Sequence, residues 1–281
     1  MYDVVRAELF KLARRPAAWV LLAAAAVLNQ VFGYLVPYLS YRSGSSSDVT
    51  NGATPEQLLA GTLPDQLVAN TIGAFPVFAG ALALVLGALM LGGEYGWGTV
   101  KTLLTQRPGR SSVLLGQLLA LAFALVVASA VLFALGAASA TAIALTEGQA
   151  LVWPGLLVLV KGFAVGVLVL LTWALLGALM GVTLRGVALP IGLGVVWVLG
   201  IENLVSAMAG SMLTALKPVR DLLPGVNAGS LVAAALPDRL VEAPPGVSAT
   251  VSEARSLVTL LCYVAVAVAA AVWTTRRRDV V

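Results

Sequence analysis

"LLVLVKGFAVGVLVLLTWALLGALMGV", residues 156–182, contains a single charged side chain, Lys161, in an otherwise apolar run. An α-helix needs about 20 consecutive, mostly apolar residues to cross the roughly 30 Å hydrocarbon core of a bilayer. This stretch is long enough to cross the core with some tilt. It therefore predicts a membrane-spanning helix.

The rest of the chain repeats this pattern. Of its 281 residues 60% are hydrophobic and 11% charged, with a mean hydropathy of +0.97, whereas about a quarter of a soluble domain is charged. A closed β-barrel would show alternating segments of ~10 residues, and the sequence shows none. We predict an all-α polytopic membrane protein with one transmembrane domain over residues 1–281. Six spans are expected, at about 17–38, 70–91, 113–142, 156–182, 188–208 and 256–273.

Lysine and arginine residues predict the orientation of these spans, because short cytoplasmic loops are enriched in both. With both termini inside, the cytoplasmic side carries Arg6, Lys11, Arg14, Arg15, Lys101, Arg107, Arg110, Arg185, Arg276, Arg277 and Arg278. The outer side then carries Arg42, Lys217, Arg220, Arg239 and Arg255. We therefore expect cytoplasmic termini in a cell (inner or plasma) membrane. Topology accounts for the net charge of +4, so no nucleic-acid partner is expected.

Several kinds of site are excluded by what the sequence lacks. It has no histidine, which removes histidine metal sites and Ser-His or Cys-His nucleophile pairs. The single cysteine, Cys262, cannot form an intrachain disulfide. Gly93 and Gly98 have the spacing of a phosphate-binding loop, but Thr99 stands where that loop requires a lysine. We expect no catalytic residue, no metal and no cofactor bound by this chain.

A polar, glycine-rich stretch, "GGEYGWGTVKTLLTQRPGR" at 92–110, separates the second and third predicted spans. It predicts a short helix at the inner membrane surface, with Thr99 as N-cap and Pro108 near its end. One face of this helix consists of Val100, Leu103, Leu104 and Arg107. Lys101, Thr105 and the flanking Glu94 remain on the aqueous side. Either lipid or another subunit covers the apolar face.

Two segments outside the predicted spans are also expected to be helical. The N-terminal residues, about 3–15, place Val5, Leu9 and Leu12 on one apolar face, which favours a helix lying flat in the inner interface. The alternative is a loose basic leader that serves only topology. The apolar piece 229–236 lies in the last outer segment and is too short to span. It is typical of a re-entrant or interfacial helix.

Two charged residues fall inside predicted spans. Glu202 lies about fourteen residues into the fifth span, roughly 21 Å from the inner surface, and Lys161 lies near the outer end of the fourth. A lone acid at mid-membrane costs on the order of 3 kcal/mol, so pairing or exposure to a water-filled cavity is expected. We hypothesise that Glu202, Asn203 and Lys161 line or brace a translocation path. The alternative is a structural hydrogen bond for Glu202 and a lysine that reaches the interface.

The inner stretch and the N-terminal helix also resemble parts of a known family. The relevant residues of the inner stretch are Glu94-Tyr95, Gly98-Thr99, Lys101-Thr102-Leu103-Leu104, Pro108 and Arg110. Their order resembles the loop between the second and third spans of ABC-2-type transporter permeases. The spacing Glu8-xx-Lys11-xx-Arg14 is similar to the amphipathic elbow helix of the same family. The sequence departs from the family at Gln117, where lysine is frequent.

The resemblance implies the transmembrane subunit of an ABC exporter. Such a permease works as a dimer, either homodimer or heterodimer, with two copies of a separate cytoplasmic ABC ATPase subunit that binds ATP and Mg. In that family the elbow and the first inner loop dock onto the ATPase, so that its closure moves the spans. The resemblance therefore assigns ATPase coupling to Glu8, Lys11, Glu94, Thr99, Val100, Lys101, Leu103, Leu104, Arg107 and Arg110.

Two other classes of function stay open at this point. An ATP-independent secondary transporter or channel would favour inverted repeats and more intramembrane ionisable groups, and neither is evident. An intramembrane protease or prenyl transferase would need paired carboxylates or an aspartate cluster, which the predicted spans lack. The family's cargoes are diverse, so the resemblance names no substrate.

Overall fold

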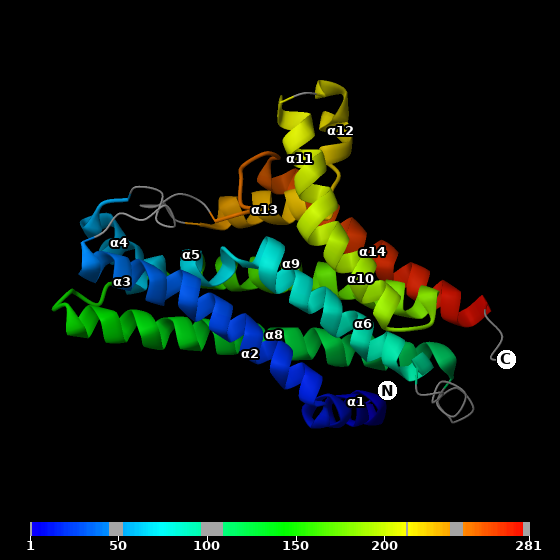
Figure 1. The fold of residues 1–281 in the computed structure, drawn as a ribbon. Coiled ribbons are helices and arrows are strands. Elements are labelled where there is room, and N and C mark those ends of the chain that lie inside the picture. The colour runs from blue at the N-terminus through cyan, green and yellow to red at the C-terminus, as the bar shows by residue number, and fades with distance from the viewer. Residues whose placement is uncertain (1, 45–52, 97–108, 212, 237–243, 278–281) are drawn as a thin grey trace.

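The computed structural model describes residues 2–44, 53–96, 109–211, 213–236 and 244–277. Those ranges contain helices and no strand (Figure 1). Within them, six helical stretches are long and apolar enough to cross a membrane: Pro16–Ser43, Pro64–Tyr95, Ser111–Thr146, Leu156–Leu184, Ala188–Ala209 and Glu253–Arg277. The predicted all-α polytopic fold is therefore confirmed.

Three of these spans are single helices, and three are interrupted by a π-helical turn. The single helices are α8 (Arg110–Thr146), α9 (Leu156–Leu184) and α14 (Glu253–Arg277). The first span is α2 (Pro16–Gln30), η1 (Val31–Leu35) and α3 (Val36–Ser43). The second is η3 (Pro64–Gln66), α5 (Leu67–Ile72), η4 (Phe75–Ala79) and α6 (Gly80–Gly96). The fifth is α10 (Ala188–Val196), η5 (Trp197–Ile201) and α11 (Glu202–Ser211).

The remaining helices lie outside the spans. On the N-terminal side these are α1 (Tyr2–Arg14), which precedes the first span, and α4 (Pro55–Gly61), which precedes the second. Between the fifth and sixth spans lie η6 (Thr214–Leu216), α12 (Lys217–Arg220) and α13 (Pro224–Ala235). The predicted N-terminal helix is thus present as α1. The apolar piece 229–236 lies mostly within α13.

The second span begins at Pro64, earlier than the boundary near residue 70 that hydropathy predicts. Polar side chains in this region bond to nearby backbone, which lets the helical stretch continue through them. Asn70 donates from Nδ2 to the Gly61 carbonyl oxygen at 2.8 Å, and Thr71 donates from Oγ1 to the Leu67 carbonyl oxygen at 2.8 Å. The polar residues left out of the predicted span are Asp65 and Gln66, which a hydropathy average counts against membrane burial although Gln66 is only 7% exposed.

Helices α6 and α9 form the centre of the bundle and pack against each other over most of their length. Glycines allow their backbones to touch. A Cβ atom at Gly177 of α9 would collide with the carbonyl oxygen of Leu84, and one at Gly87 of α6 would collide with that of Ala174. Small residues at such crossings let membrane helices approach closely, so that dispersion forces hold them together.

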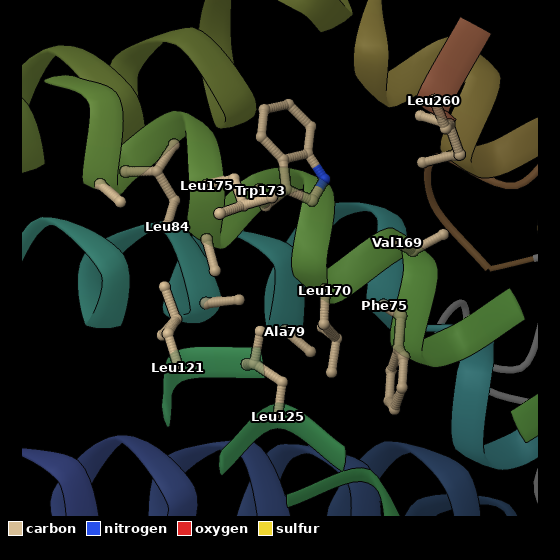
Figure 2. Close-up of a cluster of buried hydrophobic side chains, with 14 of the residues drawn as sticks. Phe75, Ala79, Leu84, Leu121, Leu125, Val169, Leu170, Trp173, Leu175 and Leu260 are labelled. Carbon is tan, nitrogen blue, oxygen red and sulfur yellow. The ribbon is translucent and has the colours of Figure 1, made fainter. Parts of the chain in front are cut away.

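A cluster of large side chains extends this core toward the π-helical turn of the second span (Figure 2). Trp173 of α9 is 1% exposed and donates from Nε1 to the Pro76 carbonyl oxygen of η4 at 3.1 Å. Phe75 packs in the same cluster. The indole therefore supplies a partner for a backbone carbonyl that the irregular turn presents to the core.

The first, fifth and sixth spans lie at the periphery. Only 11%, 22% and 22% of their most apolar windows are buried, against 56% in the second and fourth spans. Figure 1 also shows α11 and α12 projecting away from the bundle. These spans therefore present broad apolar surface to lipid or to another chain.

Candidate coupling site and outer polar cavity

Helix α1 packs against the start of α8 rather than standing free of the bundle. Gly116 of α8 makes room for it, because a Cβ there would lie 2.5 Å from Val4 Cγ1. Leu12 is buried, and Val5 and Leu9 pack against the hydrophobic core. The predicted apolar face thus contacts protein. Since α1 is an ordered helix, the alternative of a loose leader is wrong.

Two carboxylates and two cations join α1 to the end of α6, and we name Glu8, Lys11, Arg15 and Glu94 the elbow cluster. Lys11 Nζ lies 2.7 Å from Glu8 Oε1 and 2.9 Å from Glu94 Oε1. Arg15 Nη2 lies 3.2 Å from the same Glu94 oxygen, while its Nη1 donates to the Leu89 carbonyl at 3.3 Å. The cluster therefore connects segments about eighty residues apart in sequence.

The two carboxylates of the elbow cluster are buried, and pairing with the two cations offsets the free-energy cost of burying them. Glu8 is 3% exposed and Glu94 5% exposed. A buried carboxylate is costly unless it is paired and hydrogen-bonded. Burial lowers the pKa of Lys11, but its hydrogen bonds and attraction to Glu8 and Glu94 outweigh this, so the pKa is raised above its usual value. The ammonium therefore stays charged at neutral pH.

The elbow cluster brings together three of the residues assigned to coupling: Glu8, Lys11 and Glu94. The other assigned residues Thr99, Val100, Lys101, Leu103, Leu104 and Arg107 lie outside the described part of the chain. Arg110 is the first residue of α8. Because Glu94 precedes the end of α6 by two residues, the cluster lies directly before the predicted inner helix.

Sequence reasoning missed Arg15, which it counted only as a topogenic charge. Arg15 lies between α1 and α2 in an extended conformation, so helical spacing from Glu8 and Lys11 does not indicate its contact. Its pairing with Glu94 joins residues 79 positions apart and left no local signal in the sequence.

Glu202 begins α11 and is 5% exposed, with both carboxylate oxygens bonded. Oε1 accepts a hydrogen bond from Trp197 Nε1 at 2.7 Å, and Oε2 accepts one from the Gly225 backbone N–H at 2.8 Å. Gly225 is in the first turn of α13, whose N–H groups have no partner within the helix. Glu202 thus caps α13 from another helix and complements its dipole.

Lys161 acts at the opposite end of the same helix. Its Nζ donates to the Ala234 carbonyl oxygen at 3.1 Å and lies 2.9 Å from Glu253 Oε1. Glu202 and Lys161 are therefore not partners of each other; they hold the N-terminal and C-terminal ends of α13. This is the favourable arrangement of an acid and a base on a helix dipole.

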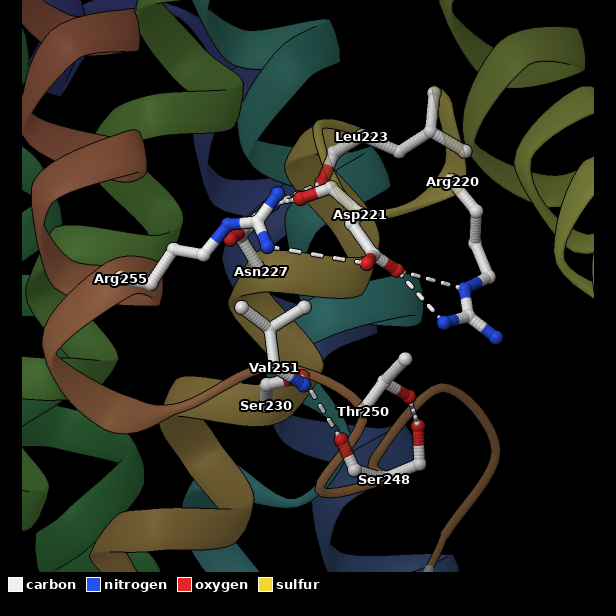
Figure 3. A network of polar contacts seen from close by, with 9 residues as sticks. All are labelled: Arg220, Asp221, Leu223, Asn227, Ser230, Ser248, Thr250, Val251 and Arg255. Atoms are coloured by element: carbon white, nitrogen blue, oxygen red, sulfur yellow. Dashed lines mark hydrogen bonds and ion pairs between the residues drawn. The ribbon is translucent and has the colours of Figure 1, made fainter. Parts of the chain in front are cut away.

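A cavity of about 290 Å³ lies beside the N-terminal end of α13. Its polar lining consists of Glu202, Asn203, Ser206, Arg220, Ser248 and Thr250. Asn203 donates from Nδ2 to the Leu199 carbonyl oxygen at 2.9 Å, within its own span. Figure 3 shows the neighbouring polar contacts, in which Asp221 lies between Arg220 and Arg255. Of the residues predicted to line or brace a path, Glu202 and Asn203 line this cavity and Lys161 does not.

Comparisons with known proteins identify the chain's relatives. The model of the family described as "ABC-2 family transporter protein" matches residues 2–280. No curated protein matches the chain. The family match covers the elbow cluster, α13 and the polar cavity together.

Proposed function

Because the chain belongs to the ABC-2 family of transporter proteins, we propose that it couples ATP hydrolysis by a separate cytoplasmic ATPase subunit to export of a substrate. The family establishes a multi-pass permease component of an ABC transporter. Such a permease is a transmembrane subunit without its own catalytic site, and it associates with an ABC ATPase and the membrane. The coupling step, the direction and the particular partner are our proposal.

The observation that carries this proposal is the elbow cluster. It fixes α1 to the last turns of α6, just before the stretch that carries the predicted inner helix. A force applied to either element by a docked partner would reach the other through buried ion pairs and, along α6, the central α6–α9 pair. Rigid, buried contacts transmit displacement better than solvated loops do.

The rest of the proposed assembly follows from this arrangement. Two permease protomers, identical or different, pair with two ATPase subunits, which bind ATP and Mg while this chain binds neither. Both termini lie in the cytoplasm of a cell whose inner or plasma membrane holds the complex. The poorly buried first and fifth spans supply apolar surface for a second protomer. Glu202 and Lys161 brace a path by fixing α13.

Co-purification tests this proposal. The chain is expressed with a soluble, Walker-A-containing protein encoded beside it, and the purified material is assayed for ATP hydrolysis in nanodiscs. We expect a stable complex whose hydrolysis rate changes when the permease is present. If no ATPase co-purifies and the chain alone mediates solute flux in vesicles, the protein is an ATP-independent transporter or channel.

Substituting Leu104 tests the docking face of the predicted inner helix. We expect Leu104→Glu to separate the permease from its ATPase, because a charge on an apolar contact costs about 2–4 kcal/mol, or more than tenfold in affinity. Thr105→Glu introduces the same charge on the adjacent, aqueous face and is expected to leave the complex intact. Size-exclusion chromatography of the co-expressed subunits measures both. If both variants retain the ATPase equally, lipid and not the ATPase covers the apolar face of the predicted inner helix.

A further inference from the structure

Two residues of opposite charge line the polar cavity. They are Glu202 and Arg220, and the guanidinium of Arg220 is also paired with Asp221. Their side chains come from different segments, α11 and α12. From this juxtaposition we propose that the cavity binds a small zwitterion, with an ammonium group against Glu202 and a phosphate group against Arg220.

The lining excludes other ligand classes. Most of its accessible surface is polar, so a purely apolar molecule would leave hydrogen-bonding groups without partners. An isolated anion would face the Glu202 carboxylate, and an isolated cation would face the Arg220 guanidinium. A molecule that carries both charges satisfies both side chains at once.

Arg220 is positioned to receive an anionic group. Its Nε and Nη2 donate to Asp221 Oδ1 at 3.0 and 2.7 Å, which fixes the plane of the guanidinium. Figure 3 shows Nη1 on the far side from Asp221. Asp221 Oδ2 lies 3.9 Å from Arg255 Nη1, so Asp221 is shared between two cations. A guanidinium with a free donor edge is a favoured partner for phosphate oxygens.

Glu202 is positioned to receive a cation. Trp197 and Gly225 hold its two oxygens by one hydrogen bond each, which fixes the carboxylate. An ionised carboxylate accepts about four hydrogen bonds in all, so acceptor sites remain for an ammonium. The hydroxyl groups of Ser248 and Thr250 lie 2.9 Å apart in the same lining. They supply neutral donors and acceptors between the charged groups.

The size of the cavity fits a headgroup or a compact metabolite. A volume of about 290 Å³ is just below the usual range for ligand sites, about 300–1,000 Å³, so the cavity suits only a small molecule. Phosphoethanolamine has the required chemistry, both as a free molecule and as the headgroup of phosphatidylethanolamine. Binding needs neither the ATPase nor transport, so it stands independently of the proposed coupling.

Titration calorimetry with phosphoethanolamine on the purified full chain tests the free form of the ligand. We expect phosphoethanolamine to bind at least about tenfold more tightly than ethanolamine or inorganic phosphate alone. Native mass spectrometry of the chain from nanodiscs containing phosphatidylethanolamine or phosphatidylglycerol tests the lipid form. Retention of phosphatidylethanolamine without binding of free phosphoethanolamine assigns the site to the headgroup and supports the proposal.

Three variants show whether either ligand occupies this cavity. Glu202→Gln and Arg220→Gln should each weaken binding about tenfold or more. Lys217→Gln removes a cation from the same short helix as Arg220, but Lys217 is exposed and lies outside the cavity lining, so this variant should bind as the unsubstituted chain does. Because Glu202→Gln alters the cap of α13, Arg220→Gln decides the result if the first variant does not fold. The proposal is overturned if the chain binds neither phosphoethanolamine nor phosphatidylethanolamine. It is also overturned if Arg220→Gln binds the ligand as tightly as the unsubstituted chain does.

Discussion

Complexes that carry Glu94→Gln are expected to lose most of the ATPase modulation that the permease confers, by about tenfold or more. The substitution removes the carboxylate charge to which Lys11 and Arg15 both pair. Breaking a fully buried pair costs about 3–5 kcal/mol. The Lys11 side chain is 36% exposed, so solvent screening reduces this to about 1–3 kcal/mol, still enough to release α1 from α6.

The measurement compares ATP hydrolysis by complexes in nanodiscs with and without the substitution. Glu56→Gln is the matched control, because it makes the same carboxylate-to-amide change at an exposed position in α4. Lys11→Met combined with Glu94→Gln should cost less than the sum of the single changes, since both remove the same contact. If Glu94→Gln complexes behave as unsubstituted ones and the double variant is additive, the elbow cluster plays no part in coupling.

Gly177→Val is expected to give the largest loss of stability of any substitution considered for this chain. The Cβ atom would collide with the Leu84 backbone carbonyl, which cannot rotate away as a flexible side chain can. Overpacking a core ordinarily costs about 1–3 kcal/mol, and a clash with backbone lies at or above the upper end of that range. We expect the thermal midpoint in detergent to fall by at least about 5 °C.

Gly192→Val provides the comparison for this experiment. Gly192 also lies in a membrane helix, α10, and a Cβ there would meet no atom within 4 Å. The change in helix propensity is the same at both positions, so only the contact differs. Fluorescence-detected size exclusion after heating measures both variants. Equal midpoints for the two would show that α6 and α9 are not as closely packed as described.

The spans were predictable because each depends on local composition. Apolar runs of sufficient length identify them, and the basic residues beside them predict which side each loop occupies. The spacing of Val5, Leu9 and Leu12 likewise indicated the amphipathic N-terminal helix. The helical stretch of the second span starts at Pro64, six residues before the predicted boundary, because hydropathy counts Asp65 and Gln66 as polar.

The sites depended on distant partners, and those could not be read from local pattern. Sequence placed Glu94 beside water, whereas the structure buries it against Lys11, 83 residues away. It identified Glu202 as an acid that needs compensation but could not name the Gly225 N–H, because that pairing is set by how α13 folds back on the bundle. A sequence pattern indicates that a charge must be satisfied; only tertiary packing determines by what.

The two-ended attachment of α13 limits how this part of the chain can change during evolution. Glu202 and Lys161 hold contacts in its first and last turns, across a helix of 12 residues and about 18 Å. One inserted or deleted residue would shift one end by about 1.5 Å and turn its face by about 100°, so one contact would be lost. Most residues of α13 are buried, so packing constrains its side chains as well. Relatives that keep both end contacts should therefore keep the length of α13.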